Sequence, residues 1–263
     1  MSASSTSPFS LQGKVVVQFG GSGLLGRALV DAIAKADATL IVASREPGAL
    51  AADAERLRAQ GAEVFLETVD LLQETSIREL VKAVVTKHGS LDGMVYNAVN
   101  RPMARFDDDL SKWEESMKLN ATGFFAAVRA CGDAMAAQKR GSIVNISSQM
   151  GTIGSNPYLY EGWGANPAPD YFFHKGGMIN LTRYLGSHYG PNKVRVNVVS
   201  PGGIYNPARP QNPEFLGRYA KMTMLGRMAD APEIGGSVVF LLSDASTYIT
   251  GANLAVDGGY TAK

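Results

Sequence analysis

The sequence predicts an α/β fold in which one doubly wound parallel sheet lies between two layers of helices. Short, almost continuously apolar runs alternate along the chain with longer stretches whose apolar residues repeat at helical spacing. Strands that are apolar on both sides, with a helix between successive strands, are typical of a parallel sheet covered on both faces. The 263 residues contain no linker rich in glycine and serine, no internal repeat and no low-complexity block, so we expect a single domain.

The elements follow one another in a regular order. The first strand is expected at Lys14–Phe19 (KVVVQF), directly before a group of glycines. Further strands are expected at Thr39–Ala43, Glu63–Thr68, Gly93–Asn97, Ser142–Ile146, Val194–Val199 and Asn253–Val256. Helices are expected between them at Leu24–Lys35, Gly48–Gln60, 73–88, 111–139 and 169–189. Residues 1–12 are polar and serine-rich, and we expect a flexible tail there before a domain over residues 13–263.

The composition excludes several classes of partner. Lysine and arginine number 25 against 24 aspartates and glutamates, so the net charge is +1 and offers no electrostatic footprint for nucleic acid or an anionic membrane. Cys131 is the only cysteine, which rules out an internal disulfide and a metal site built from cysteines, and we expect no metal. The N-terminus lacks the apolar core of a signal peptide and no run is long enough to span a membrane, so a cytoplasmic protein is expected.

A glycine-rich loop, GGSGLLG, separates the first strand from the first helix. Glycines let the backbone turn sharply and approach a pyrophosphate, which sits at the N-terminus of the following helix. A tight turn without a ligand is the alternative, but the place of the loop between a strand and a helix favours a dinucleotide site. The loop residues expected at the cofactor are Gly20, Ser22, Gly23, Leu25 and Gly26.

The end of the second strand distinguishes NAD from NADP, because it lies beside the adenosine ribose. The residue there is Ser44, and Arg45 follows it. An aspartate at this place would accept hydrogen bonds from a free 2′-hydroxyl and repel a 2′-phosphate, whereas a guanidinium binds a phosphate through paired hydrogen bonds. We therefore expect NADP; a solvated arginine at a strand end, with NAD as the cofactor, is the alternative.

Two further segments carry side chains suited to acid–base chemistry. Tyr171 and Lys175 are four residues apart in YFFHK and share one face of an expected helix. An ammonium beside a phenol favours the phenolate, and Lys175 could also hydrogen-bond the nicotinamide ribose. Ser147 and Ser148 follow a strand, where a hydroxyl can hold a substrate carbonyl. Asn120 lies inside an expected helix as either a functional amide or one bonded to backbone.

Together these features resemble the short-chain dehydrogenase/reductase family, whose fold is of the Rossmann type, from about Gly13 to Gly259. The motifs that carry the resemblance, in chain order, are the glycine loop, Asp70 in VDLL, Asn97-Ala98, Asn120, NISS, the YxxxK pair, Ser200-Pro201-Gly202 and the closing VDGG. The resemblance implies an NAD(P)-dependent oxidoreductase that interconverts a secondary alcohol and a carbonyl by hydride transfer. The cofactor supplies that hydride chemistry.

The resemblance also implies roles for individual residues. Tyr171 would be the acid/base, Lys175 its activator, Ser148 the residue that orients the carbonyl, and Asn120 part of a water-linked proton relay. Ser148 is preferred to Ser147 because Gly151 follows three residues later, as in the family. The other residues expected at the cofactor are Asp70, Leu71, Asn97, Pro201, Gly202 and Ile204. A homotetramer is expected through the helices near 111–139 and 169–189 and the last strand, with apolar faces such as those of Phe124, Phe125 and Val128.

The sequence departs from the family pattern at four places. Leu24 stands where the family has its middle glycine, YNAV (96–99) replaces Asn-Asn-Ala-Gly, and Asn206 stands at the usual threonine. Ser148 and Tyr171 are 23 residues apart, roughly ten more than usual, and long loops are often functional. The inserted loop near 155–168 contains Tyr158, Tyr160, Glu161 and Trp163. These side chains would suit a hydroxyl-rich, ring-shaped ligand; an inert surface loop or a subunit contact is the alternative.

The insert, with YEG and SPGGI, is similar to dehydrogenases of bacterial sugar-acid pathways. We therefore expect a sugar, a polyol or a sugar acid as substrate, contacted by the insert and by the segment near 204–226. One alternative is a 3-oxoacyl or other carbonyl reductase with an apolar substrate. A more distant alternative is a sensor that binds the cofactor without catalysis, although such proteins typically lose the tyrosine or the lysine.

Overall fold

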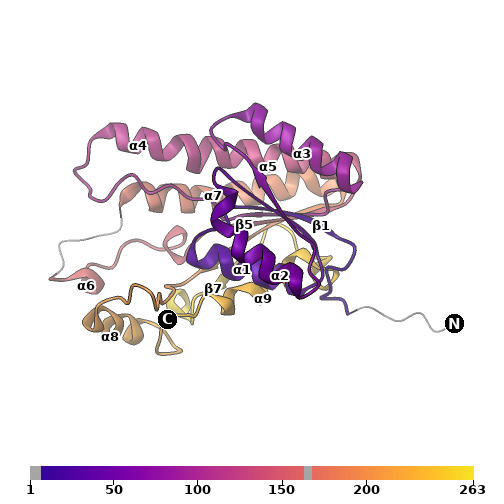
Figure 1. The fold of residues 1–263 in the computed structure, drawn as a ribbon. Helices are drawn as coiled ribbons and strands as arrows, with labels where there is room; N and C mark the ends of the chain where they lie inside the picture. The colour runs from indigo at the N-terminus through magenta and orange to yellow at the C-terminus, as the bar shows by residue number, and fades with distance from the viewer. Residues whose placement is uncertain (1–6, 163–167) are drawn as a thin grey trace.

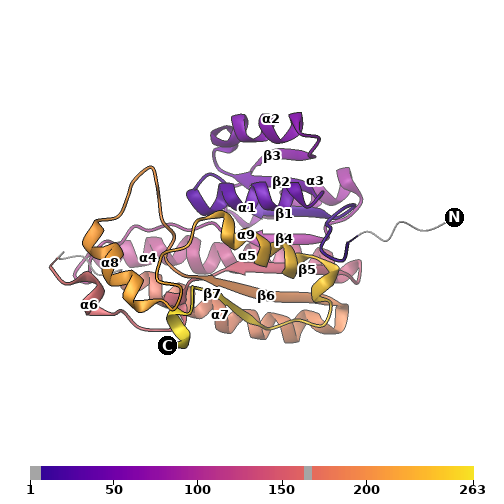
Figure 2. The ribbon, with the colours of Figure 1, turned by 90° about the horizontal axis from the view of Figure 1, so that it is seen from below.

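The structure, a computed structural model, describes residues 7–162 and 168–263. Within them, seven parallel strands form one sheet in the order β3-β2-β1-β4-β5-β6-β7 (Figures 1 and 2). The strands are β1 (Val15–Phe19), β2 (Thr39–Ser44), β3 (Val64–Thr68), β4 (Gly93–Tyr96), β5 (Gly141–Ile146), β6 (Val194–Pro201) and β7 (Asn253–Val256). The predicted doubly wound parallel sheet is confirmed, since β1 pairs with β2 on one side and with β4 on the other.

Helices cover both faces of the sheet (Figure 1). One layer is formed by α1 (Leu24–Lys35), α2 (Ala51–Ala59) and α9 (Pro232–Leu242), the other by α3 (Glu74–His88), α4 (Leu110–Met117), α5 (Phe124–Ala137) and α7 (Pro169–Tyr189). Successive side chains of a strand point to opposite faces. Val15 and Val17 of β1 accordingly join the core under α3, α5 and α7, while Val16 joins the core under α1, α2 and α9. Burial on both faces explains the apolar runs of the sequence.

The helix predicted over 111–139 is interrupted. A π-helical turn, Lys118–Gly123, separates α4 from α5. Here the chain passes so close to the end of β3 that a Cβ on Gly123 would lie 2.5 Å from the carbonyl oxygen of Leu71. A π-turn adds a residue to a helix and is frequent at functional sites. Apolar spacing does not reveal a single added residue, which is why the sequence predicted one continuous helix.

The folded domain begins at an earlier residue than the sequence predicted. Leu11 is fully buried, and its backbone N–H donates to the carbonyl of Ala36 over 2.7 Å. The carbonyl of Pro8 accepts from Ala245, and the ring of Phe9 lies 6.2 Å from that of Phe240. The predicted flexible tail is therefore wrong for residues 8–11, because this short segment contains its own apolar anchor. Residues 1–6 lie outside the described residues.

Two helices and two side chains also differ from prediction. The segment near 204–226 contains α8 (Pro213–Met222), and α9 was not predicted at all. The sequence of α9, PEIGGSVVFLL, is mostly apolar, and the helix packs against the sheet beside α1. Phe124 and Val128 belong to the core, so they form no part of an exposed apolar face on α5. Phe125 remains partly exposed.

The carboxyl ends of the strands meet at one edge of the sheet, where chain order reverses between β1 and β4. Open α/β sheets bind their ligands in the crevice outside this point. Across residues 7–162 and 168–263, no helix is long and apolar enough to cross a membrane. The same residues contain no group of three or more His, Cys, Asp or Glu placed to hold a metal ion.

Candidate active site

Two connected cavities run along the carboxyl edge of the sheet. The larger has a volume of about 740 Å³ and reaches from the glycine loop to Tyr171. The smaller, of about 400 Å³, lies beyond the glycine loop at the ends of β2 and β3. Gly23, Asn97 and Val99 line both cavities. Together they form one elongated crevice that crosses the point where the strand order reverses.

The glycine loop is built for close approach. Gly20 has a φ of +83°, and a Cβ there would lie 2.7 Å from the Ala98 backbone. A Cβ on Gly26 would lie 2.7 Å from the carbonyl oxygen of Gly21. Gly23 is the N-cap of α1; within the described chain, no atom outside its own turn lies within 4 Å of such a Cβ, and no side chain caps the helix. The free N–H groups of the first turn therefore face open space, as a pyrophosphate requires.

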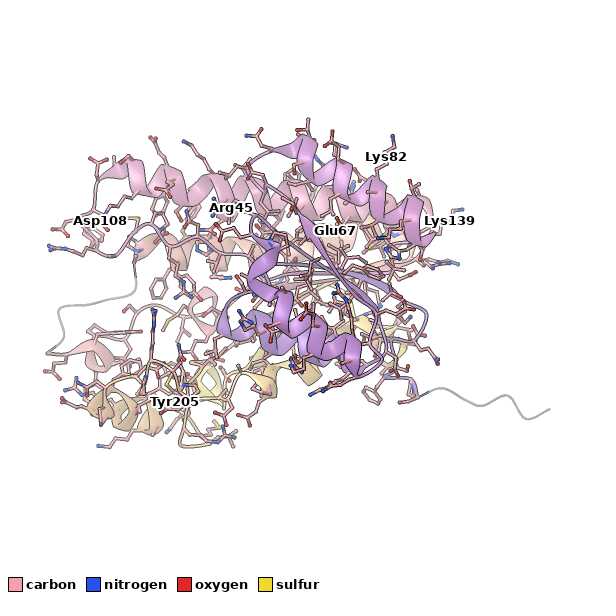
Figure 3. The ribbon with its side chains drawn as sticks, viewed as in Figure 1. Arg45, Glu67, Lys82, Asp108, Lys139 and Tyr205 are labelled. Atoms are coloured by element: carbon pink, nitrogen blue, oxygen red, sulfur yellow. The ribbon has the colours of Figure 1, made fainter. Side chains whose placement is uncertain are left out.

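The smaller cavity is lined by the residues from which the choice between NAD and NADP was predicted. Ser44 ends β2, and its buried Oγ has no hydrogen-bond partner among the described residues. Arg45 follows on the surface (Figure 3). Glu46, which the sequence analysis did not weigh, also lines this cavity. Asp70 lies beside the lining, where its carboxylate accepts from the N–H of Leu72 over 3.0 Å.

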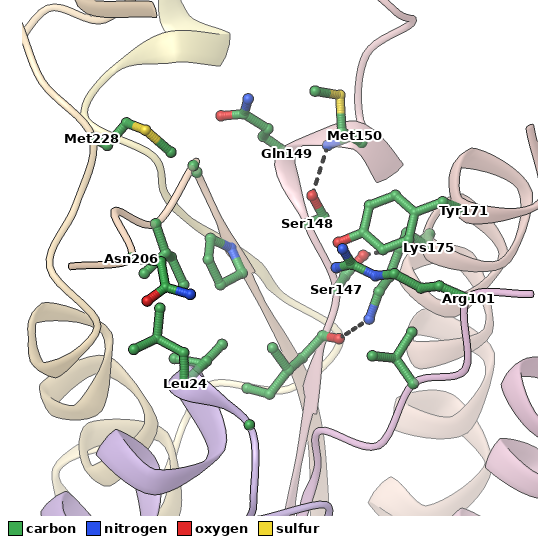
Figure 4. A pocket seen from close by; sticks show the side chains of 18 of the residues that line it. Leu24, Arg101, Ser147, Ser148, Gln149, Met150, Tyr171, Lys175, Asn206 and Met228 are labelled. Atoms are coloured by element: carbon green, nitrogen blue, oxygen red, sulfur yellow. Dashed lines mark hydrogen bonds between the residues drawn. The ribbon is translucent and has the colours of Figure 1, made fainter. Parts of the chain in front are cut away.

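Three of the four catalytic side chains predicted from the sequence gather at one end of the larger cavity (Figure 4), whereas Asn120 does not line it. Ser148, Tyr171 and Lys175 all line it. The Oγ of Ser147 donates to the carbonyl of Lys175 over 2.8 Å, so this hydroxyl holds α7 in place. The Oγ of Ser148 accepts from the N–H of Met150 over 3.1 Å, which leaves its hydrogen available to a substrate oxygen. The two serine hydroxyls therefore differ: that of Ser147 is used within the protein, and that of Ser148 is available to a ligand.

Lys175 is buried, and its Nζ donates to the carbonyl of Ile146 over 2.6 Å. Burial, with a smaller contribution from the charge of Arg101, lowers the pKa of Lys175 to about 7. His174 packs edge-on against the Tyr171 ring, with 5.3 Å between the ring centroids. Burial is the main cause that lowers the pKa of His174 to about 3, so this imidazole is neutral at physiological pH.

Asn120 lies in the π-turn and acts on the backbone of the loop that follows β4. Its Oδ1 accepts from the N–H of Asn100 over 2.9 Å, and its Nδ2 donates to the carbonyl of Asn100 over 2.7 Å. The same Nδ2 donates to Ser116 Oγ, which in turn donates to the buried carboxylate of Asp170. This is the backbone-bonded arrangement that the sequence left open. The water-linked relay stays a prediction.

Arg101 was not among the predicted site residues. It lines the larger cavity, and its guanidinium carbon, Cζ, lies 4.6 Å from the centroid of the Tyr171 ring (Figure 4). Residue 101 lies in a loop without periodicity, 70 positions before Tyr171 in the chain. Only the folded arrangement brings the two side chains together.

The inserted loop rests on α8 at the mouth of the larger cavity. Its short helix α6 (Pro157–Tyr160) is held by Arg218, whose Nη1 donates to the carbonyls of Tyr158 and Glu161 over 3.0 and 2.7 Å. Tyr160 lines the cavity, whereas the side chains of Tyr158 and Glu161 are exposed. Trp163 lies outside the described residues. The insert thus contributes one described aromatic side chain to the site.

The segment after β6 completes the cavity. Pro201, Gly202, Ile204 and Asn206 line it, together with Leu24 from the start of α1. A Cβ on Gly202 would lie 2.8 Å from the Asp257 backbone, so the closing VDGG motif packs directly under this turn.

Comparisons with known proteins agree with this geometry. Residues 22–261 match the family model described as enoyl-(acyl carrier protein) reductase. Galactitol 2-dehydrogenase (L-tagatose-forming) of Cereibacter sphaeroides is 33% identical over 258 residues, which cover 96% of this chain and 97% of that protein. The 3-oxoacyl-[acyl-carrier-protein] reductase FabG of Aquifex aeolicus is 31% identical over 252 residues, 95% of this chain and 98% of that protein.

A gluconate 5-dehydrogenase from Burkholderia cenocepacia, solved with NADP and tartrate, superposes with a TM-score of 0.87 at 25% identity, covering 97% of this chain and 98% of that one. Fold, crevice and relatives define an NAD(P)-dependent oxidoreductase that interconverts a secondary alcohol and a carbonyl. The chain belongs to the short-chain dehydrogenase/reductase family.

Proposed function

We propose that this oxidoreductase acts on a sugar, a polyol or a sugar acid, uses NADP, and employs Tyr171 as its acid and base. The observation that carries the proposal is the convergence of Ser148, Tyr171 and Lys175 at one end of the larger cavity, at the far end from the glycine loop. Proton-transfer and orienting groups act only within hydrogen-bond reach of a shared reacting position, and the common cavity of these three residues supports such a position.

The crevice fits a dinucleotide. The loop residues Gly20, Ser22, Gly23, Leu25 and Gly26 would hold the pyrophosphate at the N-terminus of α1. Ser44, Arg45, Asp70 and Leu71 would surround the adenosine, and Asn97, Pro201, Gly202 and Ile204 the nicotinamide half. When bound, the nicotinamide supplies hydride chemistry at the substrate carbon.

The protein's own residues then manage the substrate oxygen. Ser148 donates its hydroxyl hydrogen to that oxygen and so fixes the reacting carbon in place. Tyr171 gives its proton to the oxygen during reduction and takes one during oxidation. The positive charge of Lys175 favours the phenolate form of the tyrosine, and the bond from its Nζ to Ile146 keeps the ammonium beside the ring.

Two observations support NADP. The guanidinium of Arg45 forms no hydrogen bond or ion pair with the part of the chain that the structure describes, and Ser44 Oγ lacks a partner there too. Both groups are therefore available to a 2′-phosphate at the end of β2. The negative charge of Glu46 opposes a phosphate, which limits the preference that Arg45 can give.

Polar side chains in the larger cavity support a hydroxyl-rich substrate. Gln149 and Asn206 offer amide N–H groups and Tyr160 offers a hydroxyl. Gln211 and Tyr219 also line the cavity, but they already hydrogen-bond within the protein. The names of two relatives, a galactitol and a gluconate dehydrogenase, agree with this class. Three methionines in the same lining and the FabG relative favour the alternative, an apolar oxoacyl substrate.

The experiment is a panel of sugars, polyols, sugar acids and 3-oxoacyl thioesters, followed by nicotinamide absorbance with each cofactor. Tyr171→Phe should lower kcat on the best substrate by a factor on the order of 10² to 10⁴, the usual contribution of a positioned proton donor, while the cofactor Kd is kept. Turnover near that of the wild type would contradict the role of Tyr171. A clear preference for thioesters would select the alternative substrate.

We also propose a homotetramer assembled through α4, α5 and α7. Phe173 and Tyr184 on α7 are 58% and 63% exposed, and Phe125 on α5 is 38% exposed. Large apolar groups that a single chain leaves in water are typical of subunit contacts.

A further inference from the structure

We infer that Arg101 binds a carboxylate of the substrate, so that the preferred substrate is a hydroxy acid, or the corresponding oxo acid, and not a neutral polyol. The inference rests on the proposed function, since it names the substrate class of the same site. It selects one of the compound classes that the sequence and the cavity lining leave open.

The first argument is the availability of the guanidinium. Arg101 stacks over the Tyr171 ring with 4.6 Å between Cζ and the ring centroid (Figure 4). Stacking uses the flat face of a guanidinium and leaves the N–H groups at its edge free for hydrogen bonds. Among the described residues no acceptor or carboxylate pairs with these N–H groups. Arg105, four residues further on, is by contrast held by Asp107 over 2.7 Å and does not line the cavity.

The second argument is that the backbone on both sides of Arg101 is held in place. Asn100 exchanges two hydrogen bonds with Asn120, through its N–H and its carbonyl. Pro102 restricts the preceding residue to extended conformations, and Met103 is buried. An arginine that is positioned before the ligand arrives loses less conformational entropy when it binds. An arginine on a loosely held loop would not offer this advantage.

The third argument is charge. Arg101 and Lys175 are the cations of the larger cavity, and the charge of Arg101 is the second cause that lowers the pKa of Lys175. The carboxylate in the same lining, Asp170, is buried and accepts from Ser116 Oγ over 2.5 Å. It forms no ion pair with Arg101 or Lys175 within the described chain, so no such pair neutralises the two cations there. A bound anion would do so, and a carboxylate matches the forked donors of arginine.

The position of Arg101 also restricts the substrate. One tyrosine carries the hydroxyl that moves the proton and supports the guanidinium that binds the carboxylate. The carboxylate and the reacting carbon of a substrate must therefore be separated by a few bonds only. Short hydroxy acids and aldonates, in which the carboxylate is close to several secondary hydroxyls, satisfy this condition.

The experiment compares acids with neutral compounds of the same carbon skeleton: D-galactonate with galactitol, D-gluconate with D-glucitol, and L-lactate with propane-1,2-diol. The proteins are the wild type, Arg101→Gln, Arg101→Lys and, as a matched control from the same loop, Arg105→Gln. Arg101→Gln should lower kcat/KM for the acids by about 10- to 100-fold, the usual effect of losing charged hydrogen bonds. The neutral compounds should change by less than about threefold, Arg101→Lys should recover part of the loss, and Arg105→Gln should resemble the wild type.

A binding measurement separates this inference from the proposed function. The Kd of each acid is measured by calorimetry for the protein saturated with NADPH, with which a hydroxy acid cannot react. Acid binding that depends on Arg101 would support the inference even if no compound were turned over. The absence of turnover would overturn the proposed function alone. The inference would be overturned if Arg101→Gln lowered kcat/KM equally for acids and neutral compounds, or if it raised the cofactor Kd without distinguishing the two kinds of compound. A wild type that uses polyols as well as acids would also overturn it.

Discussion

Replacing Lys175 by methionine should stabilise the protein at neutral pH while removing its activity. Lys175 is 4% exposed, and within the described chain its Nζ hydrogen-bonds the carbonyl of Ile146 and forms no ion pair with a carboxylate. A buried ammonium without a counter-charge is costly. Methionine has a similar length and is apolar, so it can fill the same space without that cost.

The magnitude follows from the pKa. Burial, and then Arg101, lower the pKa of Lys175 from 10.5 to about 7. Each unit corresponds to about 1.4 kcal/mol, so burial of the lysine costs about 4 kcal/mol at pH 7. Loss of the hydrogen bond leaves the Ile146 carbonyl without this donor, which offsets about 1–3 kcal/mol. The Lys175→Met protein should therefore be more stable by about 1–3 kcal/mol at pH 7.

The pH dependence makes this test specific. Between about pH 7 and 10.5 the unfolded lysine binds a proton that the folded one has lost, so the free energy of unfolding of the wild type rises with pH in this window. The excess of the free energy of unfolding of Lys175→Met over that of the wild type should shrink by the same amount in this window, and it should be constant below about pH 7. Urea unfolding at several pH values and one protein concentration measures it. Lys82→Met, on the outer surface of α3 (Figure 3), is the control and should show no such trend. A Lys175→Met protein less stable than wild type at every pH, by a constant amount, would refute the reasoning.

Three other outcomes are expected. Ser44→Asp combined with Arg45→Ala should shift the ratio of kcat/KM for NADP and NAD towards NAD by about 10- to 100-fold; a wild type that already prefers NAD tenfold would contradict it. Arg218→Ala should release α6 from α8 and raise the substrate KM several-fold while the cofactor Kd stays constant, and unchanged kinetics would leave the insert without a role. Light scattering at micromolar concentration should give four chains per particle, falling with Phe173→Asp or Tyr184→Asp; a monomeric wild type would refute the assembly.

Much of the fold could be predicted because burial on both faces of a parallel sheet leaves a direct record in the sequence. The runs KVVVQF and TLIVA predicted β1 and β2 to within one residue at one end of each strand. Helix α9 was missed although its buried residues, such as Ile234, Val238 and Leu241, follow helical spacing, because further apolar residues between them obscure the pattern. Helix α8 carried a signal that was not used, since Asn212 caps it and Pro213 begins it.

The candidate site also contains residues that the sequence could predict and residues that it could not. Tyr171, Lys175 and Ser148 were predictable since each lies in a short motif at an element boundary, and the structure brings all three to one cavity. Arg101 was not, because its contact with Tyr171 joins a loop to a distant helix and no local pattern records it. The roles of the insert side chains were also beyond prediction, since contacts with the distant α8, among them those of Arg218 and Phe215, orient α6.

The π-turn Lys118–Gly123 determines how the two halves of one long helix are rotated relative to each other. Each residue of an α-helix adds a rotation of roughly 100° about the axis. Deleting one residue from the turn would give a continuous α-helix, with α5 still anchored in the core and α4 turned by about that angle. Ser116 would then leave Asp170, and Asn100 would lose both Asn120 and Glu115. One residue thus sets the angular alignment between the core of the protein and the loop that carries Arg101.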